Sequence, residues 1–524
     1  MSEKLKILAR HRSKIYFPAQ PMPPAADTTD SKLKNFLRKF TMMTSAPREL
    51  WIVYGAYIME NLAYKVGAAS VLTLWLSADL GFGDKSAGAM IAVWSAMLTL
   101  ITVLVGSLVD ALGIRRTFLL GFWICLVART VMTLTAERWI VLPFGLFLQA
   151  AGIALMTPVM VAACKRYSNA AQRSVAFALF YALMNFGYAV GDMIFDAVRG
   201  AATERSPLHK EHMAHVWSPT WQSLQQCPYQ MLIFLSVLFT IPGLILVWFC
   251  LRDGVEMTEE GVKITQRENS GINSVATLLK SVRESAAKTW KIFSSLWGQP
   301  AFYRFLSFMS LVVGVRMIYY YILFLFPKYG LRELGDGLKI GHLTGVLNEV
   351  MILALVPICG VLTQKISAYR MVTFGSLISA MSVFFIALPP AWFQPLADGF
   401  VGNAVAHQWL GVVGAVNPLY VSIFFFIVLY SIGETLWSPR LYEYAAACAP
   451  KGQEASYMSL SMLPMFAAKF FVGISSGWLL AKYCPLTGPR HSEIIWLIIG
   501  CLGLVTPLGT FLFRKKLQLH EAGR

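Results

Sequence analysis

Long apolar segments, separated by polar or charged stretches, make up most of the chain from residue 50 onward. An α-helix needs about 20 mostly apolar residues to cross a bilayer. Twelve segments meet that requirement, at approximately 50–79, 86–109, 117–135, 139–163, 174–198, 229–250, 302–327, 341–363, 371–390, 417–445, 456–481 and 493–513. The pattern predicts an all-α, polytopic membrane protein with twelve transmembrane helices.

The longest polar stretch between these segments divides the predicted helices six and six. It is charged, and its second half, residues 274–297, has the spacing of an amphipathic helix. The stretches 199–228 and 391–416 are too polar or too broken to span a membrane. We therefore expect two six-helix bundles, with boundaries at 1–49 (basic tail), 50–251 (first bundle), 252–300 (linker), 301–513 (second bundle) and 514–524 (second tail).

Composition agrees with a bilayer as the solvent. The 524 residues are 56% hydrophobic and only 14% charged, whereas soluble proteins average about 25% charged residues. The net charge of +17 suggests nucleic acid at first sight, but its distribution does not. With the N-terminus inside, 29 of the 45 Lys and Arg residues lie in cytosolic stretches, ten in outer loops and six within helices. The positive-inside rule then predicts that both termini are cytosolic. We expect a plasma or inner membrane. The positive charge is explained by this orientation, so binding to nucleic acid is not needed to account for it.

The tail and the cysteines carry weaker signals. The first 49 residues lack the short apolar core of a signal peptide and read as a cytosolic tail. Its segment 32–40 can lie as a basic amphipathic helix on an anionic leaflet or remain solvated. Among eight cysteines, Cys227 and Cys484 both fall in predicted outer loops and are candidates for a disulfide.

A charged glycine-containing motif joins the second and third predicted helices. It reads Gly106-Ser-Leu-Val-Asp110-Ala-Leu-Gly113-Ile-Arg115-Arg116 and resembles the G-x-L-x-D-x-x-G-x-R-[RK] loop of the major facilitator superfamily. Gly106 permits close helix approach, Gly113 permits a tight turn, and Asp110 can pair with Arg115 or a helix end. A degenerate copy, from Gly360 to Arg370, joins helices eight and nine. Such a loop in each half is expected of an internally repeated transporter, in which it latches the cytosolic side in one state.

Several helices are also similar to the proton-dependent oligopeptide transporter family. The matches are Phe180-Tyr181 with Asn185 and Gly187 in helix five, Glu434 through Ser438-Pro439 in helix ten, Asn348 with Pro357 in helix eight, and Glu60 through Gly67 in helix one. The resemblance implies that Glu434 binds substrate or gates the pathway. Helix one departs from the family's E-x-x-E-R-F-x-Y-Y-G motif, because Tyr57, Asn61 and Lys65 replace a Glu, the Arg and a Tyr. Thr157 also stands where the family has a lysine before proline in helix four. These positions serve proton coupling and peptide binding in that family, so another substrate fits as well.

Charged side chains within the predicted helices are the candidate site residues, because a charge near the bilayer centre costs at least about 2.5–3.5 kcal/mol. Glu60, Lys65, Arg316 and Glu434 lie at mid-span in helices one, seven and ten. Arg129 and Asp192 are a candidate structural pair between helices three and five. Arg316 and Lys65 can attract a carboxylate or phosphate, while Glu434 and Glu60 can meet an amine or hold a coupling proton. The full predicted substrate site comprises Tyr57, Glu60, Asn61, Tyr64, Lys65, Asn185, Arg316, Tyr320, Asn348, Glu434 and Trp437.

Other classes of function lack their motifs. The chain has no P-loop, nucleophile elbow, H-E-x-x-H or dinucleotide fingerprint, so we expect neither an enzyme nor a cofactor. The run His209, His212, His215 has no Cys or acid to complete a site, so we expect no metal. The predicted function is a monomeric secondary transporter of a small zwitterionic or anionic solute, proton-coupled and working by alternating access. An uncoupled facilitator or antiporter of a non-peptide anion, and a transport-dead sensor on the same fold, remain alternatives.

Overall fold

The computed structural model describes residues 42–69, 71–203, 227–258, 261–264, 300–363, 366–448 and 462–517, with residues 283, 284, 287 and 294. The predictions for segment 32–40 and for the three clustered histidines lie outside the described residues, as does most of the predicted linker helix. The chain divides into two compact units, Met1–Ala46 and Pro47–Arg524. In the first unit, a short 3-10 helix covers Met42–Ser45.

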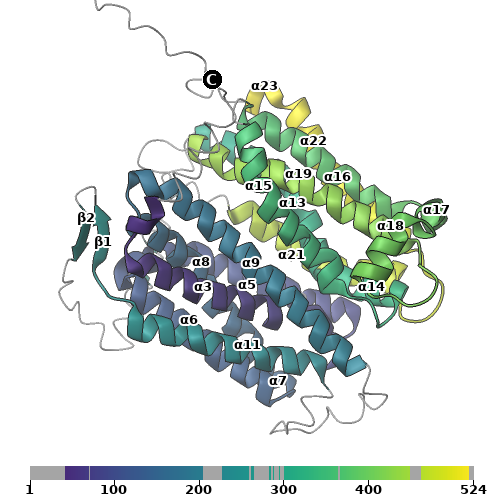
Figure 1. Ribbon diagram of the computed structural model, residues 1–524, viewed down its shortest axis with the longest axis horizontal. Helices are drawn as coiled ribbons and strands as arrows, with labels where there is room; N and C mark the ends of the chain where they lie inside the picture. The colour runs from purple at the N-terminus through teal and green to yellow at the C-terminus, as the bar shows by residue number, and fades with distance from the viewer. Residues whose placement is uncertain are drawn as a thin grey trace, which may run out of the picture. The chain divides into compact units, whose positions relative to one another are not determined.

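The first bundle contains the helices from α3 to α11, most of them labelled in Figure 1, and ends with the π-helical turn η3. The first predicted span is broken into α3 (Arg48–Gly67) and α4 (Val71–Ala78). The others are α5 (Asp84–Leu112), α6 (Ile114–Leu134), α7 (Arg138–Val141) continuing through the π-helix η2 (Leu142–Phe147) into α8 (Leu148–Arg166), α9 (Ala170–Thr203), and α11 (Pro228–Ile245) with the π-helical turn η3 (Leu246–Cys250).

The second bundle repeats this arrangement from α13 onward. Its helices are α13 (Pro300–Phe324) with α14 (Phe326–Leu334), the π-helix η4 (Gly341–Val346) leading into α15 (Leu347–Leu362), α16 (Ala368–Ala387), α19 (Leu419–Cys448), α21 (Met462–Tyr483) and α22 (Ser492–Leu512), followed by α23 (Arg514–Leu517). Between α16 and α19 lie four short helical turns, η5 (Pro390–Phe393), α17 (Gln394–Ala397), α18 (Phe400–Gly402) and η6 (Asn403–Trp409). Both α11 and α13 begin at a proline, which suits the first helical turn because it needs no N–H donor there.

Each of the twelve predicted segments coincides with a helix or a helix pair. Within the described residues, eleven helices are long and apolar enough to cross a membrane. The helix that falls short is α3, whose 20 residues include Arg48, Glu49, Glu60 and Lys65. The predicted membrane class and helical content are therefore confirmed.

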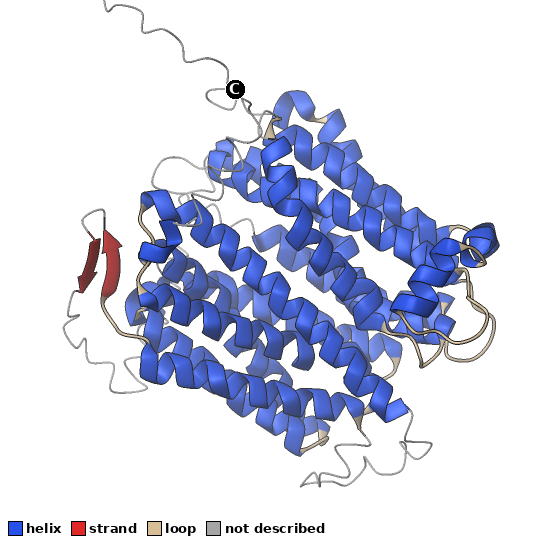
Figure 2. Cartoon of the chain, in the orientation of Figure 1, coloured by secondary structure: helices blue, strands red, loops and turns tan. Residues whose placement is uncertain are grey.

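Successive long helices run in alternating directions, so their ends form two faces on opposite sides of this unit. The terminal face is the end where α3 begins and α22 ends. The opposite face is the end that carries α7, α14, α17 and α18 (Figure 1). A two-stranded antiparallel hairpin, β1 (Val255–Thr258) with β2 (Gly261–Ile264), follows η3 and stands apart from the helices in Figure 2. The hairpin lies in the first half of the predicted linker, for which no element was predicted; the all-α class holds for the membrane-spanning helices.

Two seams of small residues join the bundles in the half nearer the opposite face. In the first, α5 packs on α21: a Cβ added to Gly88 would lie 2.5 Å from the carbonyl oxygen of Gly473, and one on Gly477 would lie 2.3 Å from that of Asp84. In the second, α9 packs on η4, where a Cβ on Gly341 would lie 2.3 Å from the carbonyl oxygen of Asp192. Glycine is therefore required for the backbones to approach this closely. These seams bring α3 and α9 of the first bundle to α13, α15 and α19 of the second, where the charged residues lie.

Candidate functional site

One buried ion pair lies entirely within the first bundle. Arg129 on α6 donates from Nη1 to Glu60 Oε2 at 2.9 Å and from Nη2 to Glu60 Oε1 at 2.7 Å. The same guanidinium donates to Thr240 Oγ1 on α11 at 2.5 Å, and the Arg129 side chain is fully buried. The predicted pairing of Arg129 with Asp192 was wrong. Glu60, predicted in the substrate site, instead satisfies a buried arginine of its own bundle.

A second charge cluster crosses between the bundles. Lys65 Nζ on α3 lies 3.0 Å from Asp192 Oδ2 on α9 and 3.7 Å from Glu349 Oε1 on α15. All three side chains are at most 6% exposed. Asp192 is pressed against η4, since a Cβ added to Gly345 would lie 1.7 Å from Asp192 Oδ2. We call these three residues the charge triad; it places one cation between two carboxylates from different bundles.

A second ion pair lies in the second bundle beside the triad. Arg316 Nη1 on α13 lies 3.7 Å from Glu434 Oε1 on α19, and Asn348 Nδ2 donates to Glu434 Oε2 at 3.2 Å. The Arg316 guanidinium also lies over the rings of Tyr319 and Trp437, 5.4 and 5.6 Å from their centroids. Its side chain is 23% exposed, whereas that of Glu434 is 5% exposed. Arg316 is thus a partly accessible cation held between aromatic faces, as anion recognition requires.

Aromatic rings surround these charges on both bundles. Tyr57 packs on Phe180, and Tyr64 packs on Tyr188, with centroids 5.0 and 5.9 Å apart. Lys65 Nζ lies 5.2 Å from the centroid of the Tyr188 ring. Tyr320 stacks on Phe324 of its own helix and lies 5.5 Å from Lys469 Nζ, which donates to Thr99 in the α5–α21 seam. Of the predicted tyrosines, Tyr64 is therefore nearest to the triad.

Two predicted amide residues point along their own helices. Asn61 Nδ2 donates to the carbonyl of Tyr57, and Asn185 Nδ2 donates to that of Tyr181, both at 2.7 Å. Asn348 is different, because it joins Glu434 to the hydroxyl of Ser431. The structure thus brings Asn348, Glu434, Arg316 and Trp437 together around one centre.

A small pocket opens between the triad and the Arg316 pair. Its walls come from both bundles, namely Lys65, Tyr319, Ile322, Leu323, Thr344, Gly345, Asn348 and Glu349. It has room for about one water molecule and not for a peptide. The bundles are therefore drawn together around the charges in this conformation.

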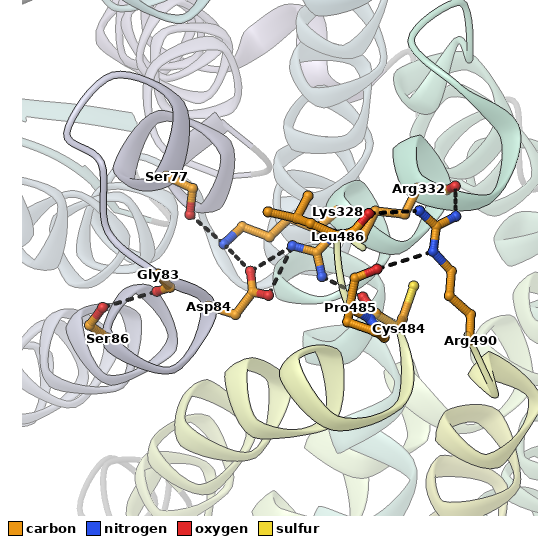
Figure 3. A network of polar contacts seen from close by, with 10 residues as sticks. All are labelled: Ser77, Gly83, Asp84, Ser86, Lys328, Arg332, Cys484, Pro485, Leu486 and Arg490. Carbon is orange, nitrogen blue, oxygen red and sulfur yellow. Dashed lines mark hydrogen bonds and ion pairs between the residues drawn. The ribbon is translucent and has the colours of Figure 1, made fainter. Parts of the chain in front are cut away.

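An ionic cluster closes the opposite face beyond this pocket. Asp84 at the start of α5 accepts hydrogen bonds from Arg332 at 2.8 and 2.9 Å and from Lys328 at 3.1 Å, both on α14 (Figure 3). Arg332 also donates to the carbonyl of Cys484, and Arg490 donates to that of Arg332. Nearer the pocket, Asp196 on α9 accepts from the backbone N–H groups of Gly341 and His342. Both contacts tie the first bundle to the second.

The predicted gating motif is only partly described. Gly113 joins α5 to α6 with φ of +86°, which confirms the tight turn. Arg115 lies 3.4 Å from Asp253 Oδ2, just after the first bundle, and donates to the carbonyl of Trp248 at 2.7 Å, so neither contact reaches the second bundle. The surroundings of Gly106 and the side chain of Asp110 are not among the described parts of the structure, and Arg116 is exposed. In the second copy, Ser367 caps α16 by accepting from Arg370 N.

Cys227 and Cys484 are both buried and do not form the proposed disulfide. Cys484 instead lies 3.5 Å from Glu333 Oε1, and Cys227 precedes α11 in the first bundle. Loop position alone could not determine the distance between the two sulfurs.

Sequence reasoning missed Asp192 and Glu349 as members of the central cluster, and it missed Asp84 and Asp196. A signal existed for the aspartates of helix five. Asp192 and Asp196 are four residues apart, so they share one helix face. Two carboxylates on one face of a transmembrane helix indicate a partner on a neighbouring helix.

Comparison with known proteins agrees with this architecture. The family model of the major facilitator superfamily matches residues 53–398. No curated protein sequence matches the chain. Among solved structures, a POT family transporter in complex with 5-aminolevulinic acid is 17% identical with a TM-score of 0.63, covering 90% of this chain and 97% of that one.

Two further structures are similar to the same extent. One comes from a study of substrate recognition in proton-dependent oligopeptide transporters, with 16% identity, a TM-score of 0.61, and coverage of 90% and 98% of the two chains. The other is a peptide transporter POT in complex with sulfate, with 17% identity, a TM-score of 0.61, and coverage of 91% and 98%. At these identities the likeness concerns the fold. The family match spans more than half of the chain, and the protein therefore belongs to the major facilitator superfamily of multi-pass membrane transporters.

Proposed function

We propose that this transporter carries a small organic solute with a carboxylate group, zwitterionic or anionic, by alternating access, together with a proton bound at Glu434. The observation that carries the proposal is the Arg316–Glu434 pair beside the interbundle pocket. At 3.7 Å, with Arg316 partly exposed between Tyr319 and Trp437, this pair is looser than the bidentate Glu60–Arg129 pair. A substrate carboxylate can displace Glu434 from the guanidinium, since arginine binds carboxylates in a two-point fashion.

The displacement links substrate to proton. A carboxylate that loses its arginine within the membrane is left without a counter-ion, and taking up a proton removes that charge. Glu434 therefore serves the coupling better than Glu60, whose two oxygens are both occupied by Arg129. The ligands named for two structural neighbours, 5-aminolevulinic acid and sulfate, include a carboxylate-bearing amine and an anion. They support the substrate class without fixing its identity.

Orientation and assembly form part of the proposal. The excess of Lys and Arg supports a cytosolic terminal face, with the chain acting as a monomer in the bilayer. The clusters at Asp84 and Asp196 then close the outer side in this conformation.

The test is uptake into proteoliposomes. Purified protein is screened with di- and tripeptides, amino acids, organic anions and nucleosides for thermal stabilisation, because a bound ligand raises apparent stability by mass action. Compounds that stabilise it are then tested for uptake with and without an inward proton gradient. We expect a carboxylate-bearing solute to be accumulated only with the gradient. Arg316→Ala should reduce uptake by at least about 100-fold, which corresponds to losing about 3 kcal/mol of hydrogen bonding to a charged group.

The matched control is Arg304→Ala, at an exposed arginine twelve residues before Arg316 on the same helix α13. It should leave uptake unchanged. Equal uptake with and without the gradient would favour an uncoupled facilitator, and binding without counterflow would favour a sensor. Uptake that persists in Arg316→Ala would refute the assigned role of this residue.

A further inference from the structure

The Lys65–Asp192–Glu349 triad has a feature that substrate binding does not explain. Its two carboxylates share one ammonium, so the triad holds an excess negative charge inside the membrane. The nearby cations contact groups outside the triad: Arg316 pairs with Glu434, Arg129 pairs with Glu60, and Lys469 donates to Thr99. An excess charge of this kind is costly in the bilayer interior, and one proton neutralises it.

The position of the triad gives that proton a mechanical effect. Lys65 and Asp192 belong to the first bundle and Glu349 to the second, so the 3.7 Å contact between Lys65 and Glu349 is an ionic tie across the interface. The contact between Lys65 and Asp192, at 3.0 Å, stays within the first bundle. Loss of charge on Glu349 therefore removes this one ionic contact between the bundles and leaves Lys65 still paired with Asp192.

The surroundings select Glu349 over the other acids. The ionisable groups facing the triad are Tyr64, Tyr188 and Asp196 of the first bundle and Tyr319, Arg316, His342 and Glu434 of the second. Asp196 accepts two backbone N–H groups and contacts the His342 ring, and Glu434 has Arg316 and Asn348. Among the described residues, Glu349 forms an ion pair with Lys65 alone, at 3.7 Å, and it borders the pocket with room for a water molecule.

We propose that Glu349 is a proton-binding site distinct from Glu434, and that its protonation breaks the ionic tie to Lys65 and releases the opposite face to open. The inference rests on the proposed transport function, since it describes how one state of the cycle is controlled. It does not depend on the identity of the solute. The step adds one proton to one Glu349 oxygen and changes no other bond.

The experiment measures opening directly, without substrate. Spin labels are placed at Trp139 and Val413, two exposed positions on the opposite face, one in each bundle, in a background without other reactive cysteines. Pulsed electron paramagnetic resonance then gives the distance distribution of the full-length protein in lipid nanodiscs between pH 8 and pH 5. We expect the wild type to shift toward longer distances on acidification, and Glu349→Gln to show the long-distance population at every pH.

Two further variants keep the test decisive. Lys65→Arg retains the tie and can contact both carboxylates, so the midpoint of the shift should move to lower pH; this variant carries the test if Glu349→Gln does not fold. Asp398→Asn, which neutralises an exposed acid on the same face, should behave as the wild type. A wild type without a pH response, or a Glu349→Gln variant that responds as the wild type does, overturns the proposal. A failure of the transport function alone would appear instead as normal opening without solute uptake.

Discussion

The Glu60–Arg129 pair and the Lys65–Asp192–Glu349 triad are both buried in the membrane, yet they differ in what the two bundles do to them. The first connects α3 to α6 within one bundle, through two short hydrogen bonds and a third to Thr240. The second reaches across the interface, with a longer contact to Glu349. Rigid-body motion of the bundles leaves the first unchanged and must alter the second. Similar residue types are therefore a structural pair in one place and a conformational control in the other.

The largest effect should come from breaking the internal pair. Glu60→Gln leaves Arg129 buried without a counter-ion, and removal of one partner of a buried ion pair costs about 3–5 kcal/mol. We expect a large drop in the apparent melting temperature in detergent, with little protein surviving purification. The double variant Glu60→Gln/Arg129→Met should recover much of that loss. A single variant as stable as the wild type would mean that the Glu60–Arg129 pair is not structural and so does not differ from the charge triad in this respect.

An intermediate effect should come from widening the interface beside the triad. Gly345→Ala places a Cβ 1.7 Å from Asp192 Oδ2, so either the Asp192 carboxylate must move or α9 and η4 must separate, at an expected cost of about 1–3 kcal/mol to the closed state. The labelled pair at Trp139 and Val413 should then show more of the longer distance at pH 8. Gly337→Ala is the matched control, because a Cβ at that position meets nothing within 4 Å. Identical distance distributions in the two variants would show that this seam does not hold the bundles closed.

The smallest effect should come from the outermost cluster. Asp84→Asn removes the acceptor charge shared by Lys328 and Arg332, whose side chains are 7% and 8% exposed. We expect a loss of about 1 kcal/mol from the closed state, which is about a fivefold change in the ratio of open to closed protein. The same spin-label measurement records it. Asp398→Asn again serves as the control, and an equal response of both variants would assign the effect to surface charge in general.

Apolar segment length was enough to predict the number and order of the helices. The motif at residues 106–116 placed the Gly113 turn, and the domain boundaries drawn around the linker stay a prediction. The pairing of charges was not accessible in the same way, because a sequence gives the helix on which a charge lies but not the rotation of that helix. Glu60 and Lys65 show the difficulty. They are five residues apart, which is about 140° around a helix, so they face different neighbours.

Part of the site could have been found from that geometry. If Glu60 and Lys65 cannot share a face, one helix carries two separate charge environments, and two partners must be sought. The sequence offered Arg129, Asp192 and Glu349 as those partners but not their distances. The hairpin at 255–264 was missed for a different reason, because four-residue strands in a charged linker give too short a pattern to recognise.

The glycine contacts between α5 and α21 have a further consequence for how easily the molecule changes state. Where Gly88, Gly473 and Gly477 meet, neither helix carries side chains with rotamers to lose. Closing such a surface costs almost no side-chain entropy, whereas immobilising a long side chain costs up to about 2 kcal/mol. Opening it therefore regains almost none, so this contact favours neither state on entropic grounds. The balance between the two states is left to the few charges beside it, which a single proton can change.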